Sequence, residues 1–175
     1  MTEVPVFHYD VGSPWCWLAG ERVQHVLGQV PVWQPVLAAD LTGVDRAAVE
    51  SAAAVQGLPP PRWPEPWPFD TELAMLAATF AKQTGRAVAF SLAAMRQAFA
   101  GGRDLSVPDN VLIAAAACEL HPRAVLKAVE TASVRDALAE ATAAAAAAGV
   151  RELPALTLDG RVFSGPHAVE EAAAG

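Results

Sequence analysis

The sequence contains only two cysteines, Cys16 and Cys118, in 175 residues. Two cysteines are too few for the disulfide network of a small secreted protein, so a cytoplasmic protein with reduced thiols is expected. Basic residues are scarce as well, because 12 Lys and Arg stand against 19 Asp and Glu, which gives a formal net charge of −7. Nucleic-acid surfaces depend on clustered Lys and Arg, so we expect no nucleic-acid partner.

Long apolar runs and targeting signals are also missing. No run reaches the roughly 18 uninterrupted apolar residues of a membrane helix, so no membrane partner is expected. The N-terminal segment MTEVPVFHYD has an acidic residue at position 3 and no basic region, which is not typical of a signal peptide. The histidines and cysteines show no metal-ligand spacing, and no GxGxxG or P-loop pattern occurs. We therefore predict neither a metal site nor a nucleotide site.

Hydrophobic residues and alanine are abundant. Hydrophobic residues make up 53% of the chain and charged residues 18%, which excludes intrinsic disorder. Alanine occurs 39 times, which favours many closely packed helices. A chain of this length can bury a sizeable core, so residues 1–175 are predicted to form a single domain.

The first 36 residues predict a β–α–β unit. Residues 4–9 (VPVFHY) are a β-type run, and residues 30–36 (VPVWQPV) form a second one. Between them, helical periodicity begins within DVGSPWCWLAG and continues to Gly28, which predicts one helix. A connection of this length normally makes the two strands parallel, with a right-handed crossover.

A long helical region follows. Residues 45–56 predict a helix, and the proline-rich segment GLPPPRWPEPWPFD after it is interpreted as an ordered loop packed by its aromatic residues. Asp70 is the expected N-cap of the next helix, and Ser133 with Asp136 resembles a capping box for the last one. The remaining helices are predicted over residues 71–85, 88–99, 107–120, 122–130 and 133–149.

The C-terminal segment returns to strands. Residues 155–158 and 162–163 predict two short strands, separated by Asp159-Gly160, a strong signal for a two-residue hairpin turn. The β–α–β beginning and this β–β–α end can share one mixed four-stranded sheet. Residues 40–132 would then be an inserted helical subdomain. This is an α/β, thioredoxin-like plan, although connectivity alone leaves other α/β folds open.

The strongest chemical signal is Ser13-Pro14-Trp15-Cys16, which follows the first strand and opens the first helix. A helix N-terminus offers free N–H groups and the positive end of the helix dipole, and both stabilise an anion such as a thiolate. The thiolate is the reactive form of a thiol. The structural alternative is that Ser13 is an ordinary N-cap, Pro14 a first-turn proline and Cys16 a small buried hydrophobic residue.

A second signal is Leu153-Pro154, directly before the predicted hairpin. A cis bond at this proline would expose backbone groups that can pair with an extended substrate, although trans is the commoner form. We expect the cis form. The strand predicted after Pro154 and the helix that begins at Ser13 would then bring this dipeptide and Ser13 to the same edge of the sheet.

These segments together resemble the DsbA-like branch of the thioredoxin superfamily. The chain is most similar to 2-hydroxychromene-2-carboxylate isomerases and kappa-class glutathione transferases. The resemblance rests on FHYDVGSPWCWLAGERV, GLPPPRWPEPWPFDTELAM, AFAGGRDLSVPDNVL and VRELPALTLDGRVFSGPHAVEEAA, in this order over nearly the whole chain. It implies a thioredoxin-like fold and thiol chemistry.

The resemblance implies a role for the first motif. Ser13 stands where DsbA-type oxidoreductases carry the nucleophilic cysteine of a Cys-x-x-Cys motif. In the isomerases and kappa-class transferases that position is a serine, whose hydroxyl binds the glutathione thiolate. Cys16 stands at the second, resolving position, and Pro14 and Trp15 between them are expected to contact the thiol. Without a cysteine at position 13, an internal disulfide cannot form, so ordinary dithiol exchange is not expected.

Three further places are implicated by the same resemblance. Leu153-Pro154 matches the cis-proline dipeptide, whose backbone pairs with glutathione or a peptide. Asp70 falls where the isomerases usually place an asparagine near the substrate. Kappa-class enzymes hold the γ-glutamyl end of glutathione with a Ser-Asp pair, and here Pro166-His167 stands in its place. The expected cofactor is therefore glutathione or another low-molecular-weight thiol.

We accordingly predict an enzyme in which Ser13 activates a low-molecular-weight thiol for isomerisation or transfer on a small substrate. One alternative is a DsbA-like oxidoreductase that acts through Cys16 as a monothiol, and another is a non-catalytic binding module. The expected partners are a small-molecule thiol and an electrophilic substrate, with a homodimer left open. Because a second-position cysteine is usually shielded, we expect Cys16 to be protonated and slow to react at neutral pH.

The aromatic residues near these motifs suggest a partly apolar cleft that suits a flat substrate. They are Trp15, Trp17, Trp63, Trp67 and Phe69. Clefts of this kind are common ligand sites. The alternative is that the rings only pack the proline-rich loop against the rest of the protein.

Overall fold

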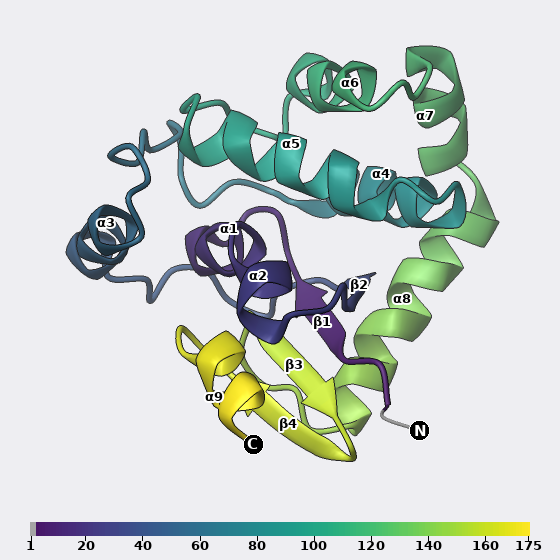
Figure 1. Cartoon of the computed structure of the whole chain (residues 1–175). Coiled ribbons are helices and arrows are strands. Elements are labelled where there is room, and N and C mark those ends of the chain that lie inside the picture. Colours follow the sequence, from purple (N-terminus) through teal and green to yellow (C-terminus); the bar gives the residue numbers. More distant parts are fainter. Residues whose placement is uncertain (1–2) are drawn as a thin grey trace.

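A computed structural model describes residues 3–175 of the protein, which contain one mixed four-stranded sheet (Figure 1). The strands are β1 (Val6–Tyr9), β2 (Val32–Pro35), β3 (Ala155–Leu158) and β4 (Arg161–Ser164), in the order β2-β1-β3-β4. Strand β1 runs parallel to β2 and antiparallel to β3, and β3 and β4 form an antiparallel hairpin. The thioredoxin-like α/β architecture predicted from the sequence is therefore confirmed.

The hairpin between β3 and β4 turns where the sequence predicted. Asp159 and Gly160 both adopt positive φ, 50° and 73°. A two-residue turn whose twist matches its strands needs positive φ at both positions, which Asp-Gly supplies at little cost. Leu158 and Arg161 then pair directly across the turn.

The crossover between β1 and β2 is two helices, α1 (Pro14–Gly20) and α2 (Val23–Leu27), so the single continuous helix expected here was wrong. The break falls at Glu21 and Arg22, and Arg22 leaves helical geometry with φ −124°. Both side chains are held by other elements. Glu21 pairs with Arg96 at 2.7 Å and Arg22 with Glu170 at 2.7 Å. Gly20 ends α1 directly before this break, and tertiary ion pairs hold the two residues that follow it.

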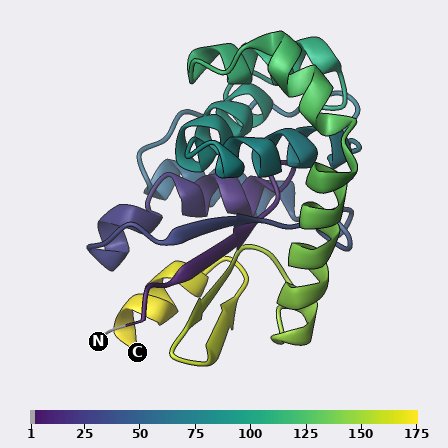
Figure 2. The ribbon, with the colours of Figure 1, turned by 90° about the vertical axis from the view of Figure 1, so that its right-hand side faces the viewer.

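The remaining helices surround the sheet. They are α3 (Arg46–Val55), α4 (Glu72–Gln83), α5 (Ala87–Phe99), α6 (Pro108–Ala117), α7 (Pro122–Val129), α8 (Ala132–Ala147) and α9 (Ala168–Ala174). Helices α4 to α7 stack above α1, and α9 packs on β3, β4 and α2 (Figure 1). Figure 2 shows α8 and α9 on opposite sides of the strands. Helices α3 to α7 fall within the segment predicted as the inserted subdomain.

Two helix starts differ from the predicted ones. The N-cap of α4 is Thr71, while Asp70 accepts a hydrogen bond from the Glu72 amide at 2.9 Å. The N-cap of α8 is Thr131, whose hydroxyl accepts from the amide of Val134. Thr131 takes the capping position predicted for Ser133, so that prediction was wrong. At α4 the helix begins one residue later than predicted, but Asp70 still supplies the side-chain oxygen that accepts from its first amide, and within residues 3–175 Thr71 makes no side-chain capping bond.

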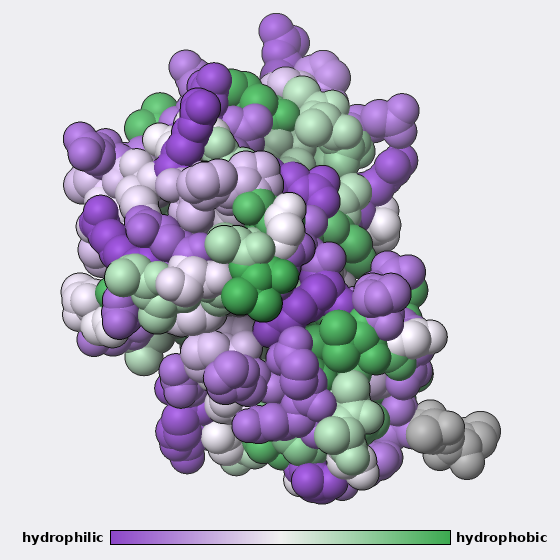
Figure 3. All heavy atoms as spheres, turned by 60° about the vertical axis from the view of Figure 1, so that its left-hand side comes forward, coloured by the Kyte–Doolittle hydropathy of each residue, from purple (hydrophilic) through white to green (hydrophobic). Residues whose placement is uncertain are grey.

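The apolar residues gather between the sheet and the helices. Phe7, Tyr9 and Trp33 pack together with ring centroids 4.9 to 5.5 Å apart, and the Tyr9 hydroxyl lies 2.6 Å from Ser91 Oγ. On the face seen in Figure 3, hydrophilic side chains predominate and hydrophobic ones are exposed only in small patches. Within residues 3–175, no helix combines the length and apolar character that a membrane span requires.

Candidate functional site

Ser13 stands at the N-terminus of α1 as its N-cap. Its backbone is extended, with φ −92° and ψ 121°, and its hydroxyl oxygen accepts a hydrogen bond from the amide of Cys16 at 3.2 Å. Its own amide donates to the Asp10 carbonyl at 3.1 Å. Within residues 3–175, the side chain that competes for the Ser13 hydroxyl proton is the Cys16 thiol. Because a neutral thiol is only a weak acceptor, that proton can be donated to an anion placed at the start of the helix.

Cys16 lies one turn further along α1 and faces the core. Its side chain is fully buried and free. Burial raises the pKa of the Cys16 thiol to about 12, and the nearby Asp10 carboxylate adds to this rise. Donation from the Ser13 hydroxyl to the Cys16 sulfur opposes this rise in pKa without cancelling it. The thiol is therefore protonated at neutral pH, as the sequence interpretation expected.

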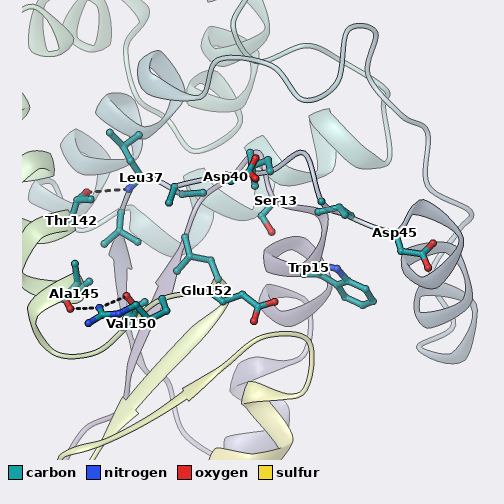
Figure 4. Close-up of a pocket in the computed structure, with 18 residues that line it drawn as sticks. Ser13, Trp15, Leu37, Asp40, Asp45, Thr142, Ala145, Val150 and Glu152 are labelled. Carbon is teal, nitrogen blue, oxygen red and sulfur yellow. Dashed lines mark hydrogen bonds between the residues drawn. The ribbon is translucent and has the colours of Figure 1, made fainter.

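A cavity of about 530 Å³ opens in front of Ser13 (Figure 4). Three parts of the chain enclose it: Ser13 and Trp15 of the α1 start, the loop after β2, and the end of α8 with the segment that leads to β3. The lining residues are Ser13, Trp15, Val36, Leu37, Ala38, Ala39, Asp40, Leu41, Gly43, Val44, Asp45, Thr142, Ala145, Ala146, Val150, Arg151, Glu152 and Leu153. The volume is within the range of small-molecule sites.

Asp10 is a site residue that sequence reasoning missed. It is fully buried, and one carboxylate oxygen accepts from the Gly12 amide at 2.9 Å. The other accepts from the Ala38 amide at 2.9 Å and from the Thr71 hydroxyl at 3.0 Å. Asp10 thus joins the Ser13 loop, the loop that lines the cavity and the start of α4. Burial raises the pKa of Asp10, and these hydrogen bonds oppose the rise.

A signal for Asp10 was present in the sequence. It is a charged residue directly after a β-type run and three positions before Ser13. A carboxylate at the end of a buried strand is costly unless several donors meet it. Two of its three donors come from Ala38 and Thr71, which are far away in the sequence, so local patterns could not identify them.

Besides Ser13, four predicted residues lie in or next to the segments that form the cavity. Pro14 occupies the first turn and is buried, and Trp15 is half-buried on the cavity wall. Leu153 lines the cavity, and its peptide bond to Pro154 is cis. Pro154 is buried behind Leu153, and its carbonyl accepts from the Gly165 amide at 2.8 Å.

Asp70, Pro166 and His167 do not line this cavity, in contrast to their expected place near the ligand. Asp70 is exposed and borders a different hollow, because Thr71 rather than Asp70 points inward to Asp10. The Pro166 carbonyl accepts from the Arg22 guanidinium at 3.0 Å. His167 is exposed at the N-cap of α9.

Most of the aromatic residues pack the proline-rich loop and do not enter the cavity. Trp67 donates from Nε1 to the Gly12 carbonyl at 3.2 Å, and its ring meets Trp63 edge to face at 5.0 Å. The Arg46 guanidinium lies over both rings. Trp17 is buried and stacks on Phe99. The prediction of a cleft bordered by five aromatic residues was therefore wrong. Of those five, Trp15 lines the cavity.

No group of three metal-binding side chains occurs within residues 3–175. The cavity instead offers one hydroxyl at a helix N-terminus, apolar surface and several charged groups at its rim. Such an arrangement can bind and stabilise a small anion beside Ser13. It does not place an ionised protein thiol there.

Comparisons with known proteins identify a family that this chain matches and solved structures that share its fold. The chain matches the DSBA-like thioredoxin domain over residues 5–174. No curated protein sequence matches it. A solved 2-hydroxychromene-2-carboxylate isomerase superposes with a TM-score of 0.85 at 13% identity, covering 98% of this chain and 93% of that one.

Two further solved structures share the fold. A probable DsbA oxidoreductase from Streptomyces coelicolor gives a TM-score of 0.78 at 19% identity, over 99% of this chain and 88% of that one. The cytosolic disulfide reductase DsbM from Pseudomonas aeruginosa, determined with GSH, gives 0.71 at 15% identity, over 98% and 96% of the two chains. At these identities the likeness is one of fold.

Proposed function

The chain belongs to the DSBA-like thioredoxin domain family, as its sequence resemblance indicated, and we propose that it is a thiol-dependent enzyme. In this proposal a low-molecular-weight thiol binds in the cavity with its sulfur beside Ser13. When bound, such a thiol supplies a nucleophilic sulfur for isomerisation of, or transfer to, a small electrophilic substrate. The solved isomerase and the GSH-containing reductase with the same fold support this choice of chemistry.

The observation that carries the proposal is the Ser13 hydroxyl, which lines the cavity and whose proton faces no stronger acceptor within residues 3–175 than the neutral thiol of Cys16. The Ser13 oxygen already accepts from the Cys16 amide, so its proton is the group left to donate into the cavity. Donation of that proton, together with the positive end of α1, favours a thiolate over a thiol. The residues present therefore fit a thiol ligand, and Leu37 and Leu153 add apolar surface to the cavity.

Cys16 is not the nucleophile in this proposal. It is fully buried, and its pKa of about 12 keeps it protonated at neutral pH. A buried neutral thiol is a poor nucleophile, because the thiolate is the reacting species. Cys16 instead packs beneath Ser13 and supplies the amide that holds the Ser13 hydroxyl oxygen.

The test compares variants at these two positions. Ser13→Ala removes the hydroxyl, so we expect it to weaken thiol binding and to raise the pKa of the bound thiol, measured by ultraviolet absorbance of the thiolate. Ser13→Thr keeps a hydroxyl and a capping oxygen, so it should restore both values. Cys16→Ser should leave both nearly unchanged.

Two other outcomes would contradict the proposal. If Cys16→Ser abolishes thiol-dependent turnover while Ser13→Ala does not, the protein is a monothiol oxidoreductase. If thiols bind equally to all three variants and no turnover is found, it is a binding module. Thermal unfolding of each variant shows whether it is folded before these comparisons are made.

A further inference from the structure

The cavity beside Ser13 is rimmed by charges of mostly one sign. Three carboxylates line it, those of Asp40, Asp45 and Glu152, against one cationic side chain, Arg151. The whole chain adds to this bias with its formal net charge of −7. A cleft lined with one sign of charge raises the local concentration of ligands of the opposite sign and repels those of the same sign.

Arg151 is turned away from a ligand toward the end of α8. Its guanidinium donates to the carbonyl of Ala146 at 2.5 Å and to the carbonyl of Val150 at 3.3 Å. Free carbonyls at a helix C-terminus are favourable partners for a cation. An anionic ligand would have to compete with these carbonyls for the one cation that lines the cavity.

The three carboxylates differ in how firmly neighbouring groups hold them. Two hydrogen bonds from Thr42 lower the pKa of Asp40, which keeps it ionised. Asp45 is held as the N-cap of α3, accepting from the Ala48 amide at 3.2 Å. Glu152 has no hydrogen bond or ion pair with any residue from 3 to 175. Figure 4 shows its side chain extending toward Trp15.

We propose that the thiol bound beside Ser13 is one without free carboxylates, and that Glu152 is the residue that discriminates against glutathione. This inference rests on the proposed function, since it concerns the ligand of the same cavity. Glutathione carries two carboxylates and one ammonium at neutral pH. Placed here, its carboxylates would face Glu152 without a free cation to pair with. A neutral or cationic thiol would meet no such repulsion.

The experiment measures the dissociation constants of glutathione and of glutathione diethyl ester by calorimetry at neutral pH and low salt. The two thiols share one backbone and differ in their carboxylates. We expect the diester to bind about tenfold more tightly or better. The difference should shrink as salt is added, because ions screen charges near the surface.

Two variants distinguish the effect of charge on binding from the effect of the ethyl groups of the diester. Glu152→Gln should improve glutathione binding severalfold and leave diester binding nearly unchanged. Glu140→Gln, which removes an exposed carboxylate of α8 outside the cavity, is the matched control and should change neither constant. Both variants alter the net charge equally, so a difference between them reports the position of Glu152.

The outcomes distinguish this inference from the proposed function. If glutathione binds as tightly as its diester, or if Glu152→Gln leaves the difference intact, the inference is overturned while a thiol-binding cavity stands. If neither thiol binds the wild-type protein or the Glu152→Gln variant, the proposed function fails, and the inference fails with it.

Discussion

Two of the three walls of the cavity are built differently. The helical wall is formed by Ser13 and Trp15 at the start of α1 and is supported by Asp10; Asp10 and Ser13 are both buried and hydrogen-bonded. The loop wall consists of residues 151–153, where Arg151 and Glu152 are exposed and their charges face the rim. Buried hydrogen bonds fix a reacting group in place, whereas exposed side chains can change without disturbing the fold. We therefore attribute chemistry to the helical wall and ligand choice to the loop wall.

The largest effect is expected from Asp10→Ala. The substitution leaves the Gly12 and Ala38 amides and the Thr71 hydroxyl without their acceptor in a buried place. Each unsatisfied buried donor costs about 1–3 kcal/mol, so we expect unfolding free energy to fall by about 3 kcal/mol or more. Urea unfolding measures this loss.

Glu152→Ala on the loop wall is the matched control for that experiment. Because Glu152 is exposed and makes no hydrogen bond with residues 3–175, its removal should change the unfolding free energy by about 0.5 kcal/mol or less. Equal losses in the two variants would remove the distinction between the walls.

The next largest effect concerns positions 13 and 16 within the helical wall. In Ser13→Cys, the new thiol stands at the N-terminus of α1, where the helix dipole and free amides favour the thiolate. We expect it to react with a thiol reagent at neutral pH at least about 100-fold faster than Cys16 does in the wild-type protein. Mass spectrometry after timed labelling assigns the modified residue. Fast labelling of Cys16 in the wild-type protein would instead favour the monothiol oxidoreductase.

A smaller effect is expected in alkaline solution. Burial raises the pKa of Cys16 from 9.0 to about 12, so between these values the unfolded chain loses the thiol proton while the folded protein keeps it. The contribution of the Cys16 thiol to the free energy of unfolding is therefore fully present below pH 9 and is lost as pH rises toward 12. Cys16→Ala should therefore reduce, by roughly 1 kcal/mol, the fall in unfolding free energy between neutral pH and about pH 10, measured by urea unfolding at each pH.

Cys118→Ala provides the comparison for that measurement. Burial also raises the pKa of Cys118, but its sulfur lies among the carbonyls at the end of α6, far along the chain from the site. Its removal should flatten the alkaline profile less than Cys16→Ala does. An unchanged profile in Cys16→Ala would mean that Cys16 ionises as easily in the folded protein as in the unfolded chain.

Local sequence patterns predicted the parts of the molecule that depend on local forces. The β–α–β unit, the Asp159-Gly160 turn and the start of α1 at Ser13 follow from residue type and spacing alone. Gly20 marks the place of the break between α1 and α2. The ion pairs that hold Glu21 and Arg22 could not be predicted in this way, because Arg96 and Glu170 are distant in the sequence.

Some residues of the candidate site could likewise be predicted from local motifs, and others could not. Ser13 and Leu153 were predicted from motifs and do line the cavity, whereas Asp70 does not. Motif position suggested Asp70, but the side chain that reaches Asp10 belongs to Thr71, one residue further along. A shift of one residue at a helix start decides which side chain points inward, and only packing fixes that choice.

The bonds of Asp10 also bear on when the site comes into being during synthesis. Its partners lie at positions 12, 38 and 71, and the cavity closes only with residues 150–153. A nascent chain that ends before Thr71 lacks one of these partners, and one that ends before Glu152 lacks a wall. Non-local contacts form late because long loops must close first. Ligand capture would therefore require a chain that extends at least to Leu153, and a labelled thiol could report when this stage is reached.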